Sequence, residues 1–280
     1  MTGAFDGRYV PKTDPPEPTL GCGLIRIGRA WGAHPQEPLR PREAHAFLTG
    51  AVELGVTFFD TAPAYGESER ILGDFLRVLS QQQRDRLVIA TKVGKHWDSE
   101  RQTTFVNHES SWARKSIEQS LVHLGRIDIL QIHKASAELL LSASIDQLIT
   151  IMQEYQIPYL GVSVSDLEAF TLGHVMMQFD YYQFPYNRQH GDLSAALTAL
   201  KKQGFGVPII NRPFAMGAMV KDEEMSRELR QEAIRDAFRF ILSATPHGVV
   251  LTGTAKLAHL RENLDAFTDA LRDSKAPAEQ

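Results

Sequence analysis

The sequence of 280 residues has almost no cysteine and no long hydrophobic run. Cys22 is its only cysteine, so no disulfide forms within the chain, and a reducing compartment is expected. The segment Met1–Leu20 carries charges and four prolines in place of an apolar core, which argues against a secretory signal. No apolar stretch approaches the length of a membrane span. These absences predict a cytoplasmic protein with no membrane partner.

Charge of one sign is also scarce. The chain has 30 basic and 34 acidic residues, a formal net charge of -4, and no basic run longer than Lys201-Lys202. Nothing therefore predicts a nucleic-acid surface, and a small molecule is the expected partner. The ten histidines show no H-E-x-x-H spacing, and no G-x-S-x-G motif occurs, so neither a metal site nor a serine hydrolase is expected. The sequence leaves the oligomeric state open.

What is present is a regular alternation of short β-branched or apolar runs with longer segments of helical period. The expected strands are Leu20–Ile25, Val56–Asp60, Leu87–Lys92, Ile127–His133, Tyr159–Ser163, Tyr181–Phe184, Val207–Arg212 and Gly248–Thr252. The expected helices are Pro41–Leu54, Ser68–Leu79, Ser111–Leu124, Ser144–Glu154, Asp166–Met177, Leu193–Gln203, Glu224–Ser243 and Ala258–Leu271. The expected N-caps are Ser68, Ser111, Ser144 and Asp166, and the expected left-handed C-caps are Gly55, Gly125 and Gly204.

Eight strands and eight helices in strict order predict an α/β protein with a single (β/α)8 TIM barrel. A doubly wound sheet is the alternative, but it gives no reason for eight units, and Gly21-Cys22-Gly23 lacks the third glycine of a dinucleotide fingerprint. The barrel is expected over residues 20–272, after a Pro-rich segment 1–19 and before a short tail 273–280. The longest irregular stretch, between Lys92 and Ser111, is expected to be a substrate loop.

Four ionisable residues follow consecutive predicted strands at the end where a TIM barrel keeps its active site. Asp60, Lys92 and His133 each end a strand, and Tyr65 follows Asp60 by five residues. Each has a structural explanation alone, as a cap, a rim residue, a solvated strand end or a core histidine. Their convergence at one mouth favours a catalytic site.

These residues stand in motifs that resemble a known family. The run Gly55–Glu69 (GVTFFDTAPAYGESE) is similar to the signature of the aldo-keto reductases, in which an Asp and a Tyr five residues apart belong to the active site. Ala90–Lys92 resembles the lysine strand of that family, and Asp128–His133 resembles its histidine strand. Further motifs follow in the order of the family: Gly161–Ser163, Gln183, Arg212–Phe214 and Gly253–Asn263. The resemblance covers about residues 20 to 270.

The resemblance implies that a reduced nicotinamide delivers hydride to a carbonyl carbon and that Tyr65 protonates the oxygen. A free phenol has a pKa near ~10, so Tyr65 needs the cationic neighbour that Lys92 supplies. Asp60 would keep Lys92 charged and oriented. His133 would hydrogen-bond the carbonyl and fix its angle. The implied activity is reduction of an aldehyde, ketone or sugar.

The resemblance also implies a cofactor site in which Ser163 and Gln183 bind the carboxamide of the nicotinamide, while Glu262 and Asn263 face the adenine. Two positions depart from the family: Val164 replaces an asparagine, and Asn211 stands where an aromatic ring often stacks on the nicotinamide. The full set of expected cofactor residues is Gly23, Leu24, Ser163, Gln183, Asn211, Arg212, Pro213, Phe214, Gly253, Thr254, Lys256, His259, Glu262 and Asn263.

The expected cofactor is NADP(H), with NAD(H) as the second choice. The family often places an arginine three residues before its Glu-Asn pair, and His259 occupies that position here, one helical turn after Lys256. Because an unperturbed histidine loses its charge near ~6.5, the preference for NADPH is expected to shrink between about pH 6 and pH 8.

Trp31, Trp97 and Phe105 are the expected walls of the substrate pocket. Two other functions remain open at this stage. A regulatory or sensor subunit would keep the barrel and NADPH but turn over slowly, and the departures at Val164 and Asn211 favour it. A TIM-barrel aldolase would use Lys92 as a Schiff base, which would leave the cofactor-like segment idle.

Overall fold

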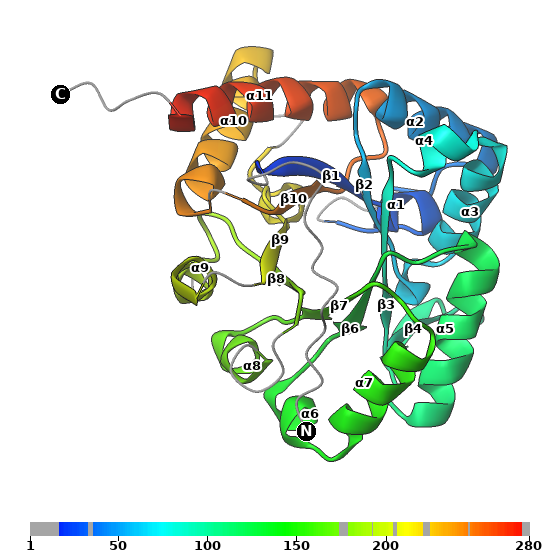
Figure 1. The fold of residues 1–280 in the computed structure, drawn as a ribbon. Helices are drawn as coiled ribbons and strands as arrows, with labels where there is room; N and C mark the ends of the chain where they lie inside the picture. The colour runs from blue at the N-terminus through cyan, green and yellow to red at the C-terminus, as the bar shows by residue number, and fades with distance from the viewer. Residues whose placement is uncertain are drawn as a thin grey trace.

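The computed structural model describes residues 17–32, 36–173, 179–191, 193–203, 206–220, 225–245 and 247–275. Within them, eight parallel strands close into a barrel in the order β1-β10-β9-β8-β7-β6-β3-β2, and helices surround it (Figure 1). This confirms the predicted (β/α)8 barrel. The strands are β1 (Thr19–Gly23), β2 (Phe58–Asp60), β3 (Val88–Val93), β6 (Ile129–His133), β7 (Tyr159–Ser163), β8 (Tyr181–Pro185), β9 (Val207–Asn211) and β10 (Val249–Thr252).

All eight predicted helices are present with ends that differ by a few residues, as at α10, which begins at Arg227, and three short helices, α1, α4 and α6, were not predicted. The end of the segment predicted over Asp166–Met177 and the first residue of Glu224–Ser243 lie outside the described residues. None of the described helices is long and apolar enough to span a bilayer. The helices are α1 (Ile25–Gly28), α2 (Pro41–Glu53), α3 (Ser68–Val78), α4 (Gln81–Arg84), α5 (Ser110–Leu124), α6 (Ala137–Leu141), α7 (Ser144–Glu154), α8 (Leu167–Leu172), α9 (Ser194–Gln203), α10 (Arg227–Ala244) and α11 (Leu257–Lys275).

The stretch predicted to be irregular, between Lys92 and Ser111, contains regular structure. It forms an antiparallel hairpin of β4 (Lys95–Asp98) and β5 (Thr103–Val106) that stays outside the barrel. The hairpin pairs Trp97 with Thr104 and His96 with Phe105. An aromatic and a β-branched residue on short paired strands suit a half-buried sheet, which is the signal that the irregular interpretation missed.

The predicted helix caps were right only in part. The Asp166 side chain accepts a hydrogen bond from the Ala169 backbone N–H at 2.8 Å, as an N-cap should. Ser68, Ser111 and Ser144 are not N-caps, because α3, α5 and α7 begin after other residues. Gly55 and Gly125 adopt the expected left-handed backbone, with φ of 90° and 76°, and Gly204 lies outside the described residues.

Two apolar layers hold the barrel. The larger one fills the space between the strands and the surrounding helices. The smaller one plugs the barrel interior, where side chains from six strands meet. The buried members of this interior layer are Phe58, Ala90, Ile129, Tyr181, Ile209, Val249 and Leu251.

The interior changes from apolar to polar one step toward the carboxyl ends of the strands. Because side chains alternate along a strand, the residue two positions after a member of the interior layer points into the barrel as well. Four strands therefore place polar groups directly above the apolar plug, and all four are almost fully buried. They are Asp60, Lys92, Gln131 and Gln183.

Candidate active site

An ion pair forms the floor of the site. Lys92 is 1% exposed, and its Nζ donates to both carboxylate oxygens of Asp60, at 2.7 and 2.6 Å, and to the Thr61 backbone oxygen at 2.9 Å. Gln131 and Gln183 each donate from Nε2 to Asp60 Oδ1 at 3.0 Å. Burial lowers the pKa of Lys92, but Asp60 and Tyr65 outweigh burial and raise it. The ammonium therefore stays charged.

Gly161 leaves the space for one of these donors. It pairs with Gln131 across β6 and β7, and a Cβ atom built on it would lie 2.8 Å from Gln131 Cγ. Any larger residue there would push the Gln131 amide away from Asp60. Glycine is therefore required because the Gln131 side chain packs closely against the backbone, and not because of the backbone angles of Gly161.

Tyr65 lies directly over the ion pair. Lys92 Nζ is 4.9 Å from the centre of the phenol ring. Burial raises the pKa of Tyr65, and the charge of Lys92 opposes that effect without overcoming it. The sequence predicted that Lys92 would lower the pKa of Tyr65, but the net shift is upward because the effect of burial is larger than that of the cation. The phenol keeps its proton, as a proton donor must.

The loop that carries Tyr65 is tied to α1. A Cβ on Gly28 would lie 1.9 Å from the Tyr65 backbone oxygen, so only glycine permits this contact. Ser68, predicted as a cap, instead lies buried with its Oγ 2.8 Å from Thr61 Oγ1 and donates to the Leu24 oxygen at 3.1 Å. These contacts fix the position of the phenol relative to β2.

His133 faces Tyr65 at the end of β6. The two rings meet edge to face at 6.1 Å and 86°. Burial, followed by the charges of Lys92 and Lys95, lowers the pKa of His133 well below its usual range. Its Nδ1 is buried and has no hydrogen-bond partner among the described residues. A neutral imidazole that lines the cavity can hydrogen-bond a substrate oxygen.

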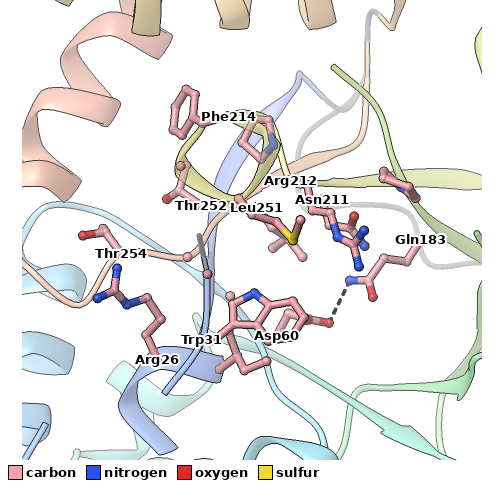
Figure 2. A pocket seen from close by; sticks show the side chains of 18 of the residues that line it. Arg26, Trp31, Asp60, Gln183, Asn211, Arg212, Phe214, Leu251, Thr252 and Thr254 are labelled. Carbon is pink, nitrogen blue, oxygen red and sulfur yellow. Dashed lines mark hydrogen bonds between the residues drawn. The ribbon is translucent and has the colours of Figure 1, made fainter. Parts of the chain in front are cut away.

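A cavity of about 290 Å³ opens above these groups, and Figure 2 shows part of its lining. Asp60, Tyr65 and His133 line it, whereas Lys92 lies behind Asp60. The structure brings most of the expected cofactor and substrate residues to this cavity. They are Gly23, Trp31, Ser163, Gln183, Asn211, Arg212, Pro213, Phe214, Gly253, Thr254, His259 and Asn263.

Five other residues that the sequence pointed to do not line this cavity. Leu24 is buried, and its backbone N–H donates to the Asp60 oxygen at 2.8 Å. Lys256 is exposed, and its N–H binds Thr254 Oγ1 at 3.1 Å. Glu262 forms an ion pair of 2.7 Å with Arg230, a cavity residue, because α10 and α11 pack together.

The two remaining residues, Trp97 and Phe105, belong to the hairpin. Phe105 stacks on His96 at 5.2 Å and meets Trp112 edge to face at 5.4 Å, which turns it toward α5. Trp97 covers the guanidinium of Arg29, which does line the cavity. Trp97 therefore reaches the cavity only through Arg29.

Two polar groups that line the cavity have unused hydrogen-bonding capacity. Asn211 Oδ1 and Thr252 Oγ1 are buried and have no partner among the described residues. In Figure 2, Asn211 lies with Gln183 and Arg212 on one side, and Thr254 lies across the cavity beside Arg26. Buried polar atoms left unsatisfied are costly, so this part of the cavity is suited to a polar ligand.

Sequence interpretation missed several residues of the site. Gln131 lies in the histidine strand, and alternation with His133 was the signal that placed it inside the barrel. Lys95 and Lys134 line the cavity from β4 and from the residue after β6. Arg29 follows α1 and Arg230 lies in α10, and both line the cavity, but the sequence does not reveal the direction of these helices.

The barrel agrees with the comparison to known proteins. The chain matches the model of the aldo/keto reductase family over residues 19–278, and it belongs to that family. Members of the family are NAD(P)H-dependent oxidoreductases that act on small-molecule carbonyls. The chain is similar to L-galactose dehydrogenase of Arabidopsis thaliana, with 28% identity covering 89% of this chain and 84% of the relative. An uncharacterised oxidoreductase of Bacillus subtilis is 24% identical and covers 88% and 86%.

Solved structures show the same fold. An aldo-keto reductase structure from Pseudomonas aeruginosa superposes with a TM-score of 0.74 at 25% identity and covers 90% of both chains. The glycerol dehydrogenase of Gluconobacter oxydans gives a TM-score of 0.71 at 21% identity and covers 99% and 98%. This second likeness concerns the fold alone.

Proposed function

We propose that the protein reduces the carbonyl of an aldehyde, ketone or sugar with NADPH, and that Tyr65 is the proton donor. One observation carries the proposal: the buried Lys92–Asp60 pair lies directly under a protonated phenol that faces a neutral His133 across the same cavity. These are the groups that an acid-assisted reduction needs, arranged around one point.

The role of each residue follows from its charge and its position. His133 donates a hydrogen bond to the substrate oxygen and fixes the carbonyl beside Tyr65. As negative charge develops on that oxygen, Tyr65 Oη transfers its proton to it, and the phenolate that remains is stabilised by the Lys92 ammonium. Asp60 does not exchange protons in this scheme. It holds Lys92 in place, and Gln131 and Gln183 hold Asp60.

Several residues along the cavity, beginning beside Asp60, support the binding of a nicotinamide dinucleotide. The unused oxygens of Asn211 and Thr252, together with Ser163 and Gln183, offer donors and acceptors for a carboxamide and a ribose. Thr254 at the approach to α11 is placed to meet a phosphate. When bound, the reduced cofactor supplies the hydride. The residues of this chain would bind it, orient it and keep water out.

The aldolase alternative conflicts with the position of Lys92. A Schiff base requires a neutral amine that reaches the substrate, but Lys92 is charged, 1% exposed and screened from the cavity by Asp60. Borohydride trapping should therefore leave Lys92 unmodified.

A panel of aldehydes, ketones and sugars tests the proposal, with the loss of reduced-nicotinamide absorbance as the readout. We expect turnover of at least one carbonyl class with NADPH, and a fall in kcat by about 10² to 10⁴ when Tyr65 is replaced by phenylalanine. Tight NADPH binding without turnover of any carbonyl would instead identify a sensor subunit.

A further inference from the structure

The substrate end of the cavity contains positive charge that no described acidic residue pairs with. Asp60 is the only acidic residue among the described residues that line the cavity, and Lys92 already neutralises it. Three cations line the same cavity near the catalytic pair: Arg29, Lys95 and Lys134, which we call the cationic cluster. None of the three forms an ion pair within the described part of the chain. Because the whole protein carries a net charge of -4, this concentration of positive charge is local.

Arg29 is held by four contacts. Its Nε donates to the Ala64 oxygen at 2.9 Å, one residue before Tyr65, and its Nη1 donates to the Ala30 oxygen at 3.5 Å. Its guanidinium carbon lies 5.1 Å from the Trp31 ring and 4.9 Å from the Trp97 ring. Two aromatic faces and two carbonyls fix the plane of the guanidinium but neutralise none of its charge. The group is therefore oriented in advance for an anion beside the phenol.

The two lysines complete the cluster from other elements. Lys95 begins β4 and is partly buried, and Lys134 follows His133 directly. Burial and the charges of Lys134, Arg29 and Arg212 all lower the pKa of Lys95, which places these cations within electrostatic reach of one another. Like charges held together without a counter-ion repel one another, and an anionic ligand would relieve that repulsion.

The backbone at Lys134 is also unfavourable. Its φ of 59° lies in the left-handed region, which costs a residue with a Cβ free energy that the surrounding fold must supply. Strain at a cation beside a catalytic group is typical of a binding site.

We propose that the carbonyl substrate carries an anionic group, a carboxylate or a phosphate, which the cationic cluster binds while the carbonyl faces Tyr65 and His133. The proposal rests on the proposed reductase function and deepens it by naming the substrate class. The cluster lies on the catalytic side of the cavity, next to Tyr65 and His133, whereas Thr254 and Asn263 line the end expected to hold the adenosine. The anion it binds is therefore part of the substrate.

Matched substrates test the proposal in the NADPH-bound enzyme. Para-carboxybenzaldehyde is compared with its methyl ester, and glyceraldehyde phosphate with glyceraldehyde. We expect kcat/KM to favour the anionic member of at least one pair by a factor on the order of 10 to 10², mainly through KM. The pair with the larger ratio identifies the anion. A ratio near one or below for both pairs would overturn the proposal.

Variants assign the preference to the cluster. Arg29→Gln should lower the anionic-to-neutral ratio of kcat/KM about tenfold, and Lys134→Asn should lower it a few-fold. Asparagine is chosen at position 134 because it is neutral and tolerates the left-handed backbone there. Taking the ratio cancels any effect of Arg29 on Tyr65 itself. Lys115→Gln, an exposed change on α5, is the charge-matched control and should leave the ratio unchanged. A wild-type ratio in both cluster variants would contradict the assignment.

A binding measurement separates this proposal from the proposed function. If the enzyme reduces no carbonyl, the reductase proposal fails, and titration of the NADPH-bound protein with benzoate against benzamide judges the cluster alone. Calorimetry should show tighter binding of benzoate, weakened by Arg29→Gln. Equal binding of benzoate and benzamide would overturn the inference whatever the enzymatic result.

Discussion

The floor of the site and the cationic cluster above it handle charge in opposite ways. On the floor, Lys92 meets Asp60, two glutamines and a backbone oxygen, and water is excluded. In the cluster, Arg29, Lys95 and Lys134 line an open cavity, and none of them forms an ion pair with a described residue. A buried charge left unpaired is far more costly than an exposed one. The floor is therefore complete without a ligand, whereas the cluster gains its counter-charge from one.

The largest effect should come from breaking the floor. Lys92→Met removes the cation that stabilises the phenolate and leaves Asp60 buried and unpaired, so we expect kcat to fall by about 10² to 10⁴ and the free energy of unfolding to fall by about 3 to 5 kcal/mol. Urea denaturation and steady-state kinetics measure the two losses. Parent-rate reduction by this variant would refute the proposed role of Lys92.

Tyr65→Phe should separate chemistry from folding on the same floor. It preserves the ring over Lys92 but removes the proton, so we expect kcat to fall by about 10² to 10⁴ with cofactor affinity little changed. NADPH titration by fluorescence checks the binding. Near-normal turnover would exclude Tyr65 as the acid.

Acid should weaken the fold through buried histidines. Burial, followed by nearby positive charges, lowers the pKa of His133, and burial lowers the pKa of His96, His108 and His247. The unfolded chain then binds more protons than the folded one below about pH 6.5, so stability falls as pH decreases through that range.

His133→Gln should remove the contribution of one such histidine to the pH dependence of the free energy of unfolding, up to about 1.4 kcal/mol per pH unit. Urea denaturation between about pH 5 and pH 7 compares the slopes, with His123→Gln at a half-buried position on α5 as the control. The same slope for wild type and His133→Gln would show that His133 is not the group held neutral.

Of the floor and the cluster, only the cluster should respond to salt. The Lys92–Asp60 pair is shielded from ions, but Lys134 is exposed, so raising the ionic strength should weaken an anionic substrate and spare a neutral one. We expect kcat/KM for the anionic member of a matched pair to fall about two- to fivefold between low salt and about 0.5 M. Parallel salt dependence for both members would argue that the charges do not act on the substrate.

The smallest effect concerns the cofactor. We expect NADPH to bind several-fold more tightly than NADH, with a preference that shrinks from about pH 6 to pH 8 as His259 loses its charge. Arg230 also lines the cavity near α11, so part of the preference should persist at high pH. Dissociation constants for both cofactors in wild type and His259→Ala measure this. If the preference for NADPH changes neither with pH nor with the substitution, His259 is not its source.

Strand periodicity was sufficient to predict the barrel and the convergence of Asp60, Lys92 and His133, since strand ends meet by topology alone. The balance of effects on Tyr65 was not predictable, because it depends on how completely the loop buries the phenol. Arg29 escaped prediction for a similar reason. Its function depends on the hairpin bringing Trp97 over it, and that contact joins segments far apart in the sequence.

The hairpin of β4 and β5 carries both Lys95 and Trp97, yet none of its strands takes part in the barrel. One short, contiguous segment thus contributes a cation of the cluster and the aromatic plate that steadies another. For protein engineering, replacing the hairpin as a unit offers a way to shift the preference toward neutral or cationic carbonyls while Asp60 and Lys92 stay on the barrel strands. Because β4 contacts the turn that ends in Tyr65, the replacement has to keep that contact. The same separation would allow substrate preference to change during evolution through substitutions in one surface segment.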